Sequence, residues 1–201
     1  MRSLTLLLLC LSGVLPLKAA EKPKIFNTQE LTIPLLKPTE ALKAITVPKG
    51  FRVQLSATEP MVQQPIAMTW DARGRLWIAE CYTYAERPTN FEKKLKDRII
   101  ILEDTNQDGV FDKRKVFWDG ASQLAGIEIG FGGVWAACAP EILFIPDANG
   151  DDIPDGKPEP ILNGFENDKV RHNIVNGLKW GPDGWLYGRH GILGPGSKVG
   201  K

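Results

Sequence analysis

The sequence has little of several features on which a function often rests. Its 201 residues include only two histidines and three cysteines. No Cys-x-x-C pair occurs, so the chain has neither a zinc knuckle nor an attachment motif for c-type haem. The formal net charge is +1, so we expect no electrostatic attraction to nucleic acid or to anionic lipid.

The only long apolar run lies at the N-terminus. A basic start at Arg2 precedes the mostly apolar residues 4–17, and small residues follow at Ala19 and Ala20. This pattern predicts a secretory signal peptide over residues 1–20. The alternative is an uncleaved membrane anchor, but the run is short for a span and Pro16 interrupts it. We therefore expect an exported protein, periplasmic or extracellular, with no membrane span after cleavage.

Export would place the remaining cysteines in an oxidising compartment. Cys81 and Cys138 each follow an apolar run and could form a disulfide there. Two buried free thiols on neighbouring strands agree equally well with the sequence. Cys10 lies inside the signal peptide and would be removed with it.

The rest of the chain favours short strands over long helices, because 20 glycines and 15 prolines punctuate it. Residues 21–50 form a proline-rich lead segment with one short helix over residues 39–44, capped by Thr39. Alternating apolar runs then predict strands at regular spacing. They cover residues 51–55, 66–70, 75–79, 99–102, 115–117, 126–129, 133–137, 142–145, 160–162, 178–180 and 185–187.

The predicted strands recur as hairpin pairs, which indicates an all-β fold. The set repeats twice and begins a third time, with the spacing of four-stranded blades. We interpret residues 51–201 as a partial β-propeller, an N-terminal fragment of roughly two and a half blades from a longer protein. The alternative is a small stand-alone sandwich. Five tryptophans at matching hairpin positions are expected to pack between neighbouring blades, with a sugar-stacking role as the alternative for the last. They are Trp70, Trp77, Trp135, Trp180 and Trp185.

Two loops rich in aspartate resemble each other. Carboxylates or amides at alternate positions, plus one at the ninth, place oxygen atoms on one side of a tight loop, as Ca²⁺ prefers. The candidate ligands are Asp104, Asn106, Asp108 and Asp112 in the first loop, and Asp147, Asn149, Asp151 and Asp155 in the second. The second loop lacks the central glycine. The alternative for both loops is that these side chains only cap their own turns.

Both histidines flank the last predicted hairpin. Arg171 and His172 precede it, and Arg189 and His190 follow it. Any proton chemistry near neutral pH is therefore expected at this entrance. Arg189 has the alternative of pairing with Asp183 or Glu80. Glu80 is also a candidate, with Tyr82, to reach the same entrance, and His172 has the alternative of ordering the loop by hydrogen bonds.

Residues 51–201 resemble the N-terminal propeller region of a family named for membrane-bound dehydrogenases in planctomycetes and verrucomicrobia. The resemblance rests on residues 65–71, 74–80, 102–109, 139–143 and 175–178. Longer members often end in a c-type haem domain. That family is distantly similar to soluble glucose and sorbosone dehydrogenases, six-bladed propellers that use pyrroloquinoline quinone (PQQ) and Ca²⁺.

In the sugar dehydrogenases a catalytic histidine precedes a Gly-x-Leu-x-x-Gly-Pro-Asp-Gly-x-Leu-Tyr hairpin. Here His172 precedes residues 177–187, with one residue fewer between Gly177 and Leu178, and the Gly-Asp that usually follows is replaced by residues 189–191. The resemblance implies that His172 accepts the hydroxyl proton of a sugar or alcohol. It also implies that Arg171 or Arg189, with His190, binds the quinone.

Three functions therefore stand as hypotheses. The first is a quinone-dependent dehydrogenase propeller that oxidises a sugar or alcohol. The second is a non-catalytic propeller that binds a glycan or a protein. The third is a calcium-dependent lactonase or hydrolase propeller.

Overall fold

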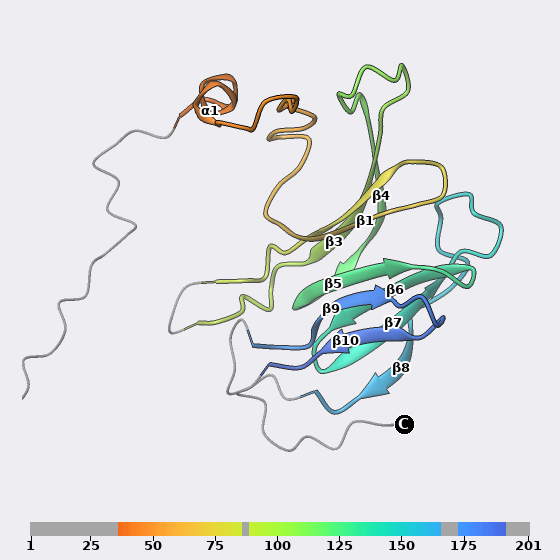
Figure 1. Cartoon of the computed structure of the whole chain (residues 1–201). Coiled ribbons are helices and arrows are strands. Elements are labelled where there is room, and N and C mark those ends of the chain that lie inside the picture. Colours follow the sequence, from red (N-terminus) through yellow and green to blue (C-terminus); the bar gives the residue numbers. More distant parts are fainter. Residues whose placement is uncertain (1–35, 86–88, 166–172, 192–201) are drawn as a thin grey trace, which may run out of the picture. The chain divides into compact units, whose positions relative to one another are not determined.

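The computed structural model describes residues 36–85, 89–165 and 173–191 (Figure 1). The chain divides into two units, Met1–Leu36 and Lys37–Lys201, and all described elements belong to the second. The predicted signal peptide and the first part of the lead segment lie outside the described residues. Within the described ranges no helix is long and apolar enough to cross a membrane.

Within the described residues, one short helix precedes ten strands. In chain order the elements are α1 (Pro38–Ala44), β1 (Pro65–Trp70), β2 (Leu76–Glu80), β3 (Asp97–Glu103), β4 (Lys113–Ala121), β5 (Leu124–Ile129), β6 (Gly133–Cys138), β7 (Glu141–Pro146), β8 (Glu159–Asn163), β9 (Asn176–Trp180) and β10 (Leu186–Arg189). The helix predicted near residue 40 is present, but its N-cap is Lys37 rather than Thr39. The reason is that Pro38, which has no N–H, occupies the first turn, and Glu40 accepts a hydrogen bond from the Lys37 N–H at 3.1 Å.

The strands form two four-stranded antiparallel sheets and a separate hairpin. Sheet one has the order β1-β2-β3-β4, sheet two has the order β5-β6-β7-β8, and β9 pairs with β10. The all-β prediction is therefore confirmed. The strand predicted over residues 51–55 is wrong, because this segment pairs with no described strand. Instead the Gln54 side-chain amide donates to the carbonyl oxygen of Asp108 at 2.7 Å, and Ser56 accepts from the Phe111 N–H.

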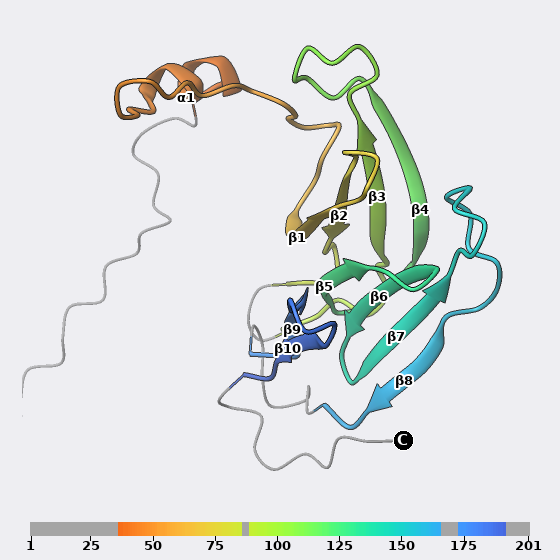
Figure 2. The ribbon, with the colours of Figure 1, turned by 45° about the vertical axis from the view of Figure 1, so that its right-hand side comes forward.

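Each sheet packs its face against the next (Figure 2), as the clusters of buried side chains show. Because side chains alternate along a strand, the central strand β6 sends Val134 and Ala136 toward sheet one and Ala137 toward the hairpin. The other face of sheet one is covered near Leu76 and Ile78 by the segment 57–62. Sheet two is thus packed on both faces, and sheet one is packed on one face and partly covered on the other.

The tryptophans divide into two groups. Trp77 is buried between the two sheets, and Trp180 lies between sheet two and the hairpin, where its indole N–H donates to the Ile129 carbonyl at 2.7 Å and its ring meets that of Trp135 edge-on. Trp70 and Trp185 are 60% and 73% exposed, so their packing between sheets is not seen in the described residues and stays a prediction. Within the described residues no sheet lies against the strand faces that carry them.

The stacking of the sheets makes a prediction about Gly133, at the start of β6. A Cβ atom added there would collide with the carbonyl oxygen of Ile145 and lie 2.7 Å from the Phe144 ring. We expect Gly133→Ala to lower the free energy of unfolding by about 1–3 kcal/mol in urea denaturation, because the paired strand cannot move away. Gly156→Ala is the control, since nothing lies within 4 Å of its added Cβ. Equal stabilities of the two variants would contradict the packing of β6 on β7.

Candidate functional site

A pocket of about 390 Å³ lies where the first strands of both sheets and of the hairpin begin. We call it the mouth pocket. Its lining residues are Ile66, Ala67, Cys81, Tyr84, Phe91, Leu124, Ala125, Ile174, Asn176, Gly177 and Arg189. The walls are mainly apolar, and the polar groups come from a few side chains, which is typical of sites for small organic ligands.

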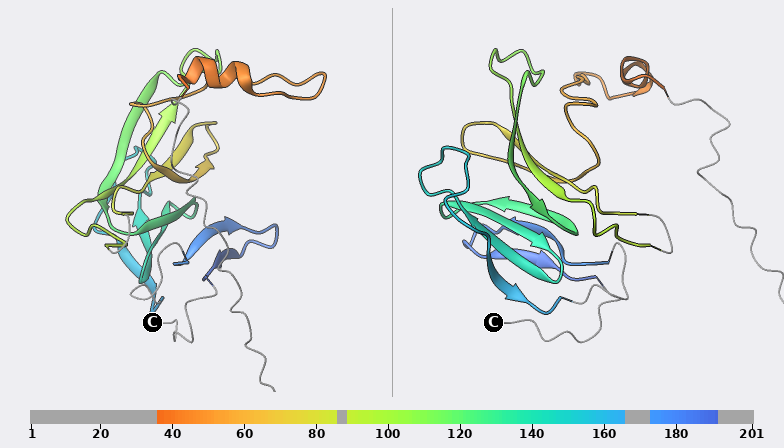
Figure 3. Two further views of the ribbon diagram at one scale, coloured as in Figure 1. Left: turned by 90° about the vertical axis from the view of Figure 1, so that its left-hand side faces the viewer. Right: turned by 180° about the vertical axis from the view of Figure 1, so that it is seen from behind.

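The first strands meet at this pocket because β5 packs against both β1 and β9. Glycines allow the close approach of β5 and β9: a Cβ added at Gly126 would lie 3.2 Å from the backbone nitrogen of Gly177. In views from the side and from behind, the blue hairpin β9–β10 lies next to sheet two (Figure 3). Three segments far apart in the chain therefore build one site.

Among the described residues, Arg189 is the one cationic side chain that lines the mouth pocket. Its guanidinium lies over Gly177, whose φ of +64° and missing Cβ leave room for it; an added Cβ would be 2.7 Å from Nε. Its alternative partners are both engaged elsewhere. Asp183 accepts a hydrogen bond from the Tyr187 hydroxyl at 2.7 Å, and Glu80 pairs with Arg114. Across residues 36–85, 89–165 and 173–191, the Arg189 guanidinium makes no hydrogen bond or ion pair.

Cys81 places a thiol in the mouth pocket. Burial and the neighbouring carboxylate of Asp97 raise its pKa to about 11, so the thiol is neutral at physiological pH and a poor nucleophile. Burial likewise raises the pKa of Cys138. Both cysteines are free and buried, so the structure has the two free thiols rather than the disulfide.

His190, next to Arg189 in the chain, lines a second pocket that Arg189 also borders. This second pocket, of about 380 Å³, lies between sheet two and the hairpin and is lined by apolar side chains that include Leu178 and Leu186. The His190 ring meets that of Phe165 edge-on at 5.4 Å, and its Nε2 atom is buried without a hydrogen-bond partner. The structure therefore separates His190 from the mouth pocket. His172 and Arg171 lie outside the described residues.

Glu80 and Tyr82 do not reach the mouth pocket, contrary to the sequence-based suggestion. The Glu80 side chain is fully buried, where it accepts hydrogen bonds from the Gln63 N–H at 2.8 Å, the Tyr82 hydroxyl at 2.8 Å and Arg114 at 3.0 Å. Arg98 lies 3.4 Å from the same carboxylate. Burial and the hydrogen bond to Glu80 raise the pKa of Tyr82. This cluster joins the ends of three strands of sheet one and is structural.

The two aspartate-rich loops have the same internal hydrogen bonds. In the first loop, the Asp104 carboxylate accepts the N–H groups of Asp108 at 3.2 Å and Gly109 at 2.7 Å. In the second loop, the Asp147 carboxylate accepts those of Asp151 at 3.1 Å and Asp152 at 3.3 Å.

The remaining candidate ligands in these loops bind backbone groups in the same way. Residues at equivalent positions of the two loops accept equivalent backbone N–H groups. These positions are Asn106 and Asn149, Asp108 and Asp151, and Asp112 and Asp155. The oxygen atoms that calcium would need thus accept N–H groups of their own loop. In the described part of the chain, no three histidine, cysteine or acidic side chains gather closely enough to hold a metal ion. Calcium binding by these loops stays a prediction.

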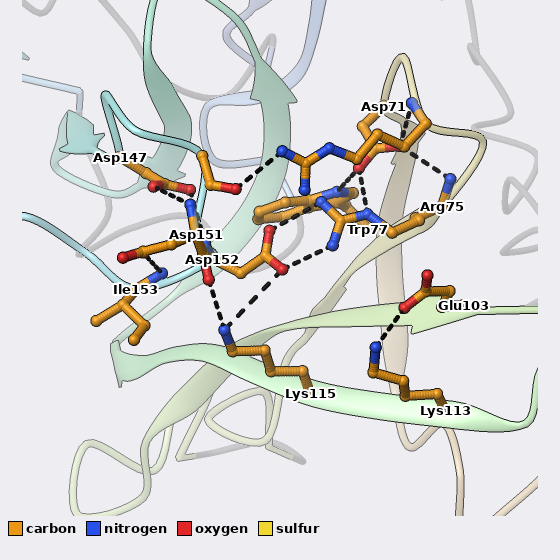
Figure 4. Close-up of polar contacts among 12 residues, drawn as sticks. Asp71, Arg75, Trp77, Glu103, Lys113, Lys115, Asp147, Asp151, Asp152 and Ile153 are labelled. Carbon is orange, nitrogen blue, oxygen red and sulfur yellow. Dashed lines mark hydrogen bonds and ion pairs between the residues drawn. The ribbon is translucent and has the colours of Figure 1, made fainter. Parts of the chain in front are cut away.

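The sequence reading missed an ion-pair cluster that joins the two sheets (Figure 4). Arg75 donates to both carboxylate oxygens of Asp152 at 2.6 and 2.8 Å and, through Nε, to Asp71 at 2.7 Å. The Trp77 indole N–H also donates to Asp71, at 3.0 Å. One sequence feature pointed to this cluster without identifying it. Asp152 stands where the first loop has Gly109, and it has a left-handed φ of +66°, which favours glycine. We call Asp71, Arg75 and Asp152 the inter-sheet cluster.

The chain matches a protein family to which no activity is assigned. Residues 37–200 match a family described as a domain of unknown function, DUF7133. No curated protein and no solved structure matches the chain. Since the match covers most of the sequence, the chain belongs to the DUF7133 family.

Proposed function

We propose that this chain is part of an exported, dehydrogenase-like β-propeller that binds a carboxylate-bearing quinone of the PQQ type in the mouth pocket and oxidises a sugar or alcohol. The observation that carries the proposal is the position of Arg189. Its guanidinium has no described partner and lines a mainly apolar pocket where β1, β5 and β9 begin. Such a group is suited to a planar ligand that carries carboxylates.

The propeller part of the proposal is supported by the repeated build of the chain. Sheets one and two have the same strand order, β9 and β10 repeat the first half of it, and β5 packs against β1 on one side and β9 on the other. In a propeller the first strands of successive blades meet in this way around a central axis.

The residues of the mouth pocket fit such a ligand. Phe91 and Tyr84 supply aromatic surface, Asn176 supplies an amide, and Arg189 supplies a forked donor for a carboxylate. When bound, the quinone would accept the hydride equivalent. In the proposal, Arg189 orients the ligand, and His172, with Arg171 beside it in the chain, accepts the substrate hydroxyl proton. His190 is left out of this role because it lines the second pocket.

A non-catalytic binding propeller is the second candidate, and one observation favours it. No carboxylate or imidazole is among the residues described as lining the mouth pocket, and its thiol is neutral. Within the described chain the pocket therefore has a means of binding but no general base. The two candidates differ only in what His172 does.

The experiment is a titration of the full chain with PQQ, followed by tryptophan fluorescence and calorimetry. We expect saturable binding that Arg189→Met weakens about tenfold or more, since a charge-assisted hydrogen bond contributes about 1.5–3 kcal/mol. Arg52→Met is the control, because Arg52 is an exposed arginine outside the pocket. Equal weakening in both variants would show only a general charge effect.

The same titration separates the two candidates when sugars and alcohols are added with a redox dye. Substrate-dependent reduction that His172→Ala abolishes, while quinone binding persists, is the result expected for a dehydrogenase. Quinone-independent glycan binding without reduction would support the binding propeller. Absence of quinone binding by a folded chain would overturn the primary proposal.

A further inference from the structure

A lysine-rich turn lies in the connection between β2 and β3. Residues 92–96 read Glu-Lys-Lys-Leu-Lys and lead from Phe91, which lines the mouth pocket, to Asp97 at the start of β3. They contain three lysines and one glutamate, a net charge of +2 that exceeds the +1 of the whole chain. All three lysines are exposed. We call Lys93, Lys94 and Lys96 the lysine turn.

Hydrogen bonds fix the backbone that carries these lysines. The Glu92 N–H donates to the Thr83 carbonyl at 2.7 Å, and the Thr83 N–H in turn donates to the buried Asp97 carboxylate at 2.7 Å. Within the turn, the Glu92 carboxylate accepts the Lys94 N–H at 3.1 Å, and the Glu92 carbonyl accepts the Leu95 N–H at 3.0 Å. The fold therefore presents the three ammonium groups from an anchored turn.

Both ends of the lysine turn adjoin the mouth pocket. At the first end, Lys93 stands two residues after Phe91, which lines the pocket, and two residues span at most about 7 Å. At the other end, Lys96 directly precedes Asp97. The Asp97 carboxylate lies 3.8 Å from the Cys81 thiol, which also lines the pocket. The lysine turn therefore borders the pocket.

The lysine turn and the mouth pocket share a positive charge. Across the described residues, no carboxylate forms an ion pair with the three ammonium groups, and the described pocket lining includes no carboxylate. Arg189 adds a guanidinium inside the pocket. Because exposed charges are screened beyond about 8 Å at physiological ionic strength, this attraction acts on a ligand that touches the turn.

We infer that the substrate is an anionic glycan, a sugar chain whose units carry carboxylates or sulfates. One unit enters the mouth pocket, and its neighbours lie across the lysine turn, where the ammonium groups pair with their anions. A chain of small units suits this arrangement, because a folded protein or a lipid bilayer cannot enter a pocket of about 390 Å³. The inference rests on the proposed function, which takes the mouth pocket as the place where the sugar binds.

The test is a calorimetric titration of the full chain with three oligosaccharides of four units: an oligouronate, a sulfated oligomer and a neutral one. We expect at least one anionic oligomer to bind about tenfold more tightly than the neutral one at low salt, since several exposed ion pairs act together. Raising the salt concentration is expected to remove this difference, because salt screens exposed charges. Equal affinities for all three oligomers at low salt would overturn the inference.

A triple substitution locates the effect. Replacing all residues of the lysine turn by methionine is expected to abolish the preference for the anionic oligomer and to leave the affinity for the neutral one unchanged. The matched control replaces three other exposed lysines outside the pocket by methionine and so changes the net charge equally. These are Lys43, Lys49 and Lys157. Equal weakening in both triple variants would reveal a general charge effect and contradict the inference.

Further outcomes separate this inference from the proposed function. Preference for an anionic oligomer without any binding of PQQ would refute the quinone and leave the anionic glycan in place. Quinone reduction by neutral sugars alone would uphold the dehydrogenase and overturn the anionic substrate. Binding to phosphatidylglycerol vesicles that the lysine-turn variant loses, without preference for an anionic oligomer, would assign the turn to a membrane surface and would also overturn the inference.

Discussion

Replacing Asp97 by alanine is expected to destabilise the chain by about 3–5 kcal/mol. This carboxylate at the start of β3 is fully buried, and it accepts the N–H of Thr83 at 2.7 Å, the Thr83 hydroxyl at 2.8 Å and the N–H of Leu124 at 2.9 Å. Leu124 begins β5, so Asp97 ties sheet one to the first strand of sheet two. Alanine would leave two buried N–H groups without an acceptor, each costing about 1–3 kcal/mol.

Chemical denaturation followed by near-ultraviolet circular dichroism measures this effect. The free energy of unfolding of Asp97→Asn is expected to lie between those of wild type and Asp97→Ala. The reason is that the single carbonyl oxygen of asparagine can accept only some of the hydrogen bonds that the carboxylate accepts. Asp119→Ala is the control, since Asp119 is exposed on the neighbouring strand β4 and its loss should cost no more than about 0.5 kcal/mol. A cost for Asp97→Ala as small as that of the control would refute the role assigned to this carboxylate.

Replacing Arg75 by methionine is the second substitution with a large expected effect, about 3–5 kcal/mol. Arg75 is 9% exposed and holds Asp71 and Asp152, which come from sheet one and from the second aspartate-rich loop. Methionine would preserve much of the packing but leave both carboxylates without their cation. Lys113→Met is the matched control: Lys113 pairs with Glu103 at 2.7 Å, but its side chain is 62% exposed (Figure 4). An exposed pair contributes only about 0–1 kcal/mol.

The inter-sheet cluster also predicts how stability depends on pH. The hydrogen bonds from Arg75 lower the pKa of Asp152 below its ordinary value of 3.8, and for Asp71 the hydrogen bonds from Trp77 and Arg75 outweigh burial and lower its pKa as well. Between the folded and unfolded pKa values, the unfolded chain binds more protons. The stabilisation is therefore complete above the unfolded value and is lost as the pH falls through the folded ones.

We expect the free energy of unfolding of wild type to fall more steeply below about pH 4 than that of Arg75→Met. Denaturation curves at a series of acidic pH values measure both slopes. Parallel slopes would mean that Arg75 does not hold these two carboxylates in solution.

The strands were predictable because their pattern is local. Alternating apolar residues bounded by turns such as 71–74 and 181–184 fix a short strand, a reversal and a second strand, whatever lies around them. The pattern failed at residues 51–55, where the alternation is present but no strand lies beside the segment to form a ladder. At Trp70 and Trp185, where size and spacing predict packing, the neighbouring sheet is not among the described residues and the prediction stays untested.

The candidate site was predictable only in part. The sequence indicated that the entrance of the last hairpin matters, and Arg189 does line the mouth pocket there. It gave no means of telling that Arg189 lines both the mouth pocket and the second pocket, whereas His190 lines the second pocket but not the mouth pocket. The irregular pairing between Tyr187 and Arg189, at the end of β10, shifts the register of side chains at this point.

The sequence by itself determined the all-β class, the order of the hairpins and the positions of the aspartate-rich loops, because each depends on residues within a few positions of one another. Only the tertiary structure decided that Arg75 meets Asp152, 77 positions away, that Glu80 is enclosed by arginines, and that β1, β5 and β9 begin around one pocket. Those contacts depend on which sheet faces meet, and that is set by the burial of many apolar side chains at once rather than by any short run of residues.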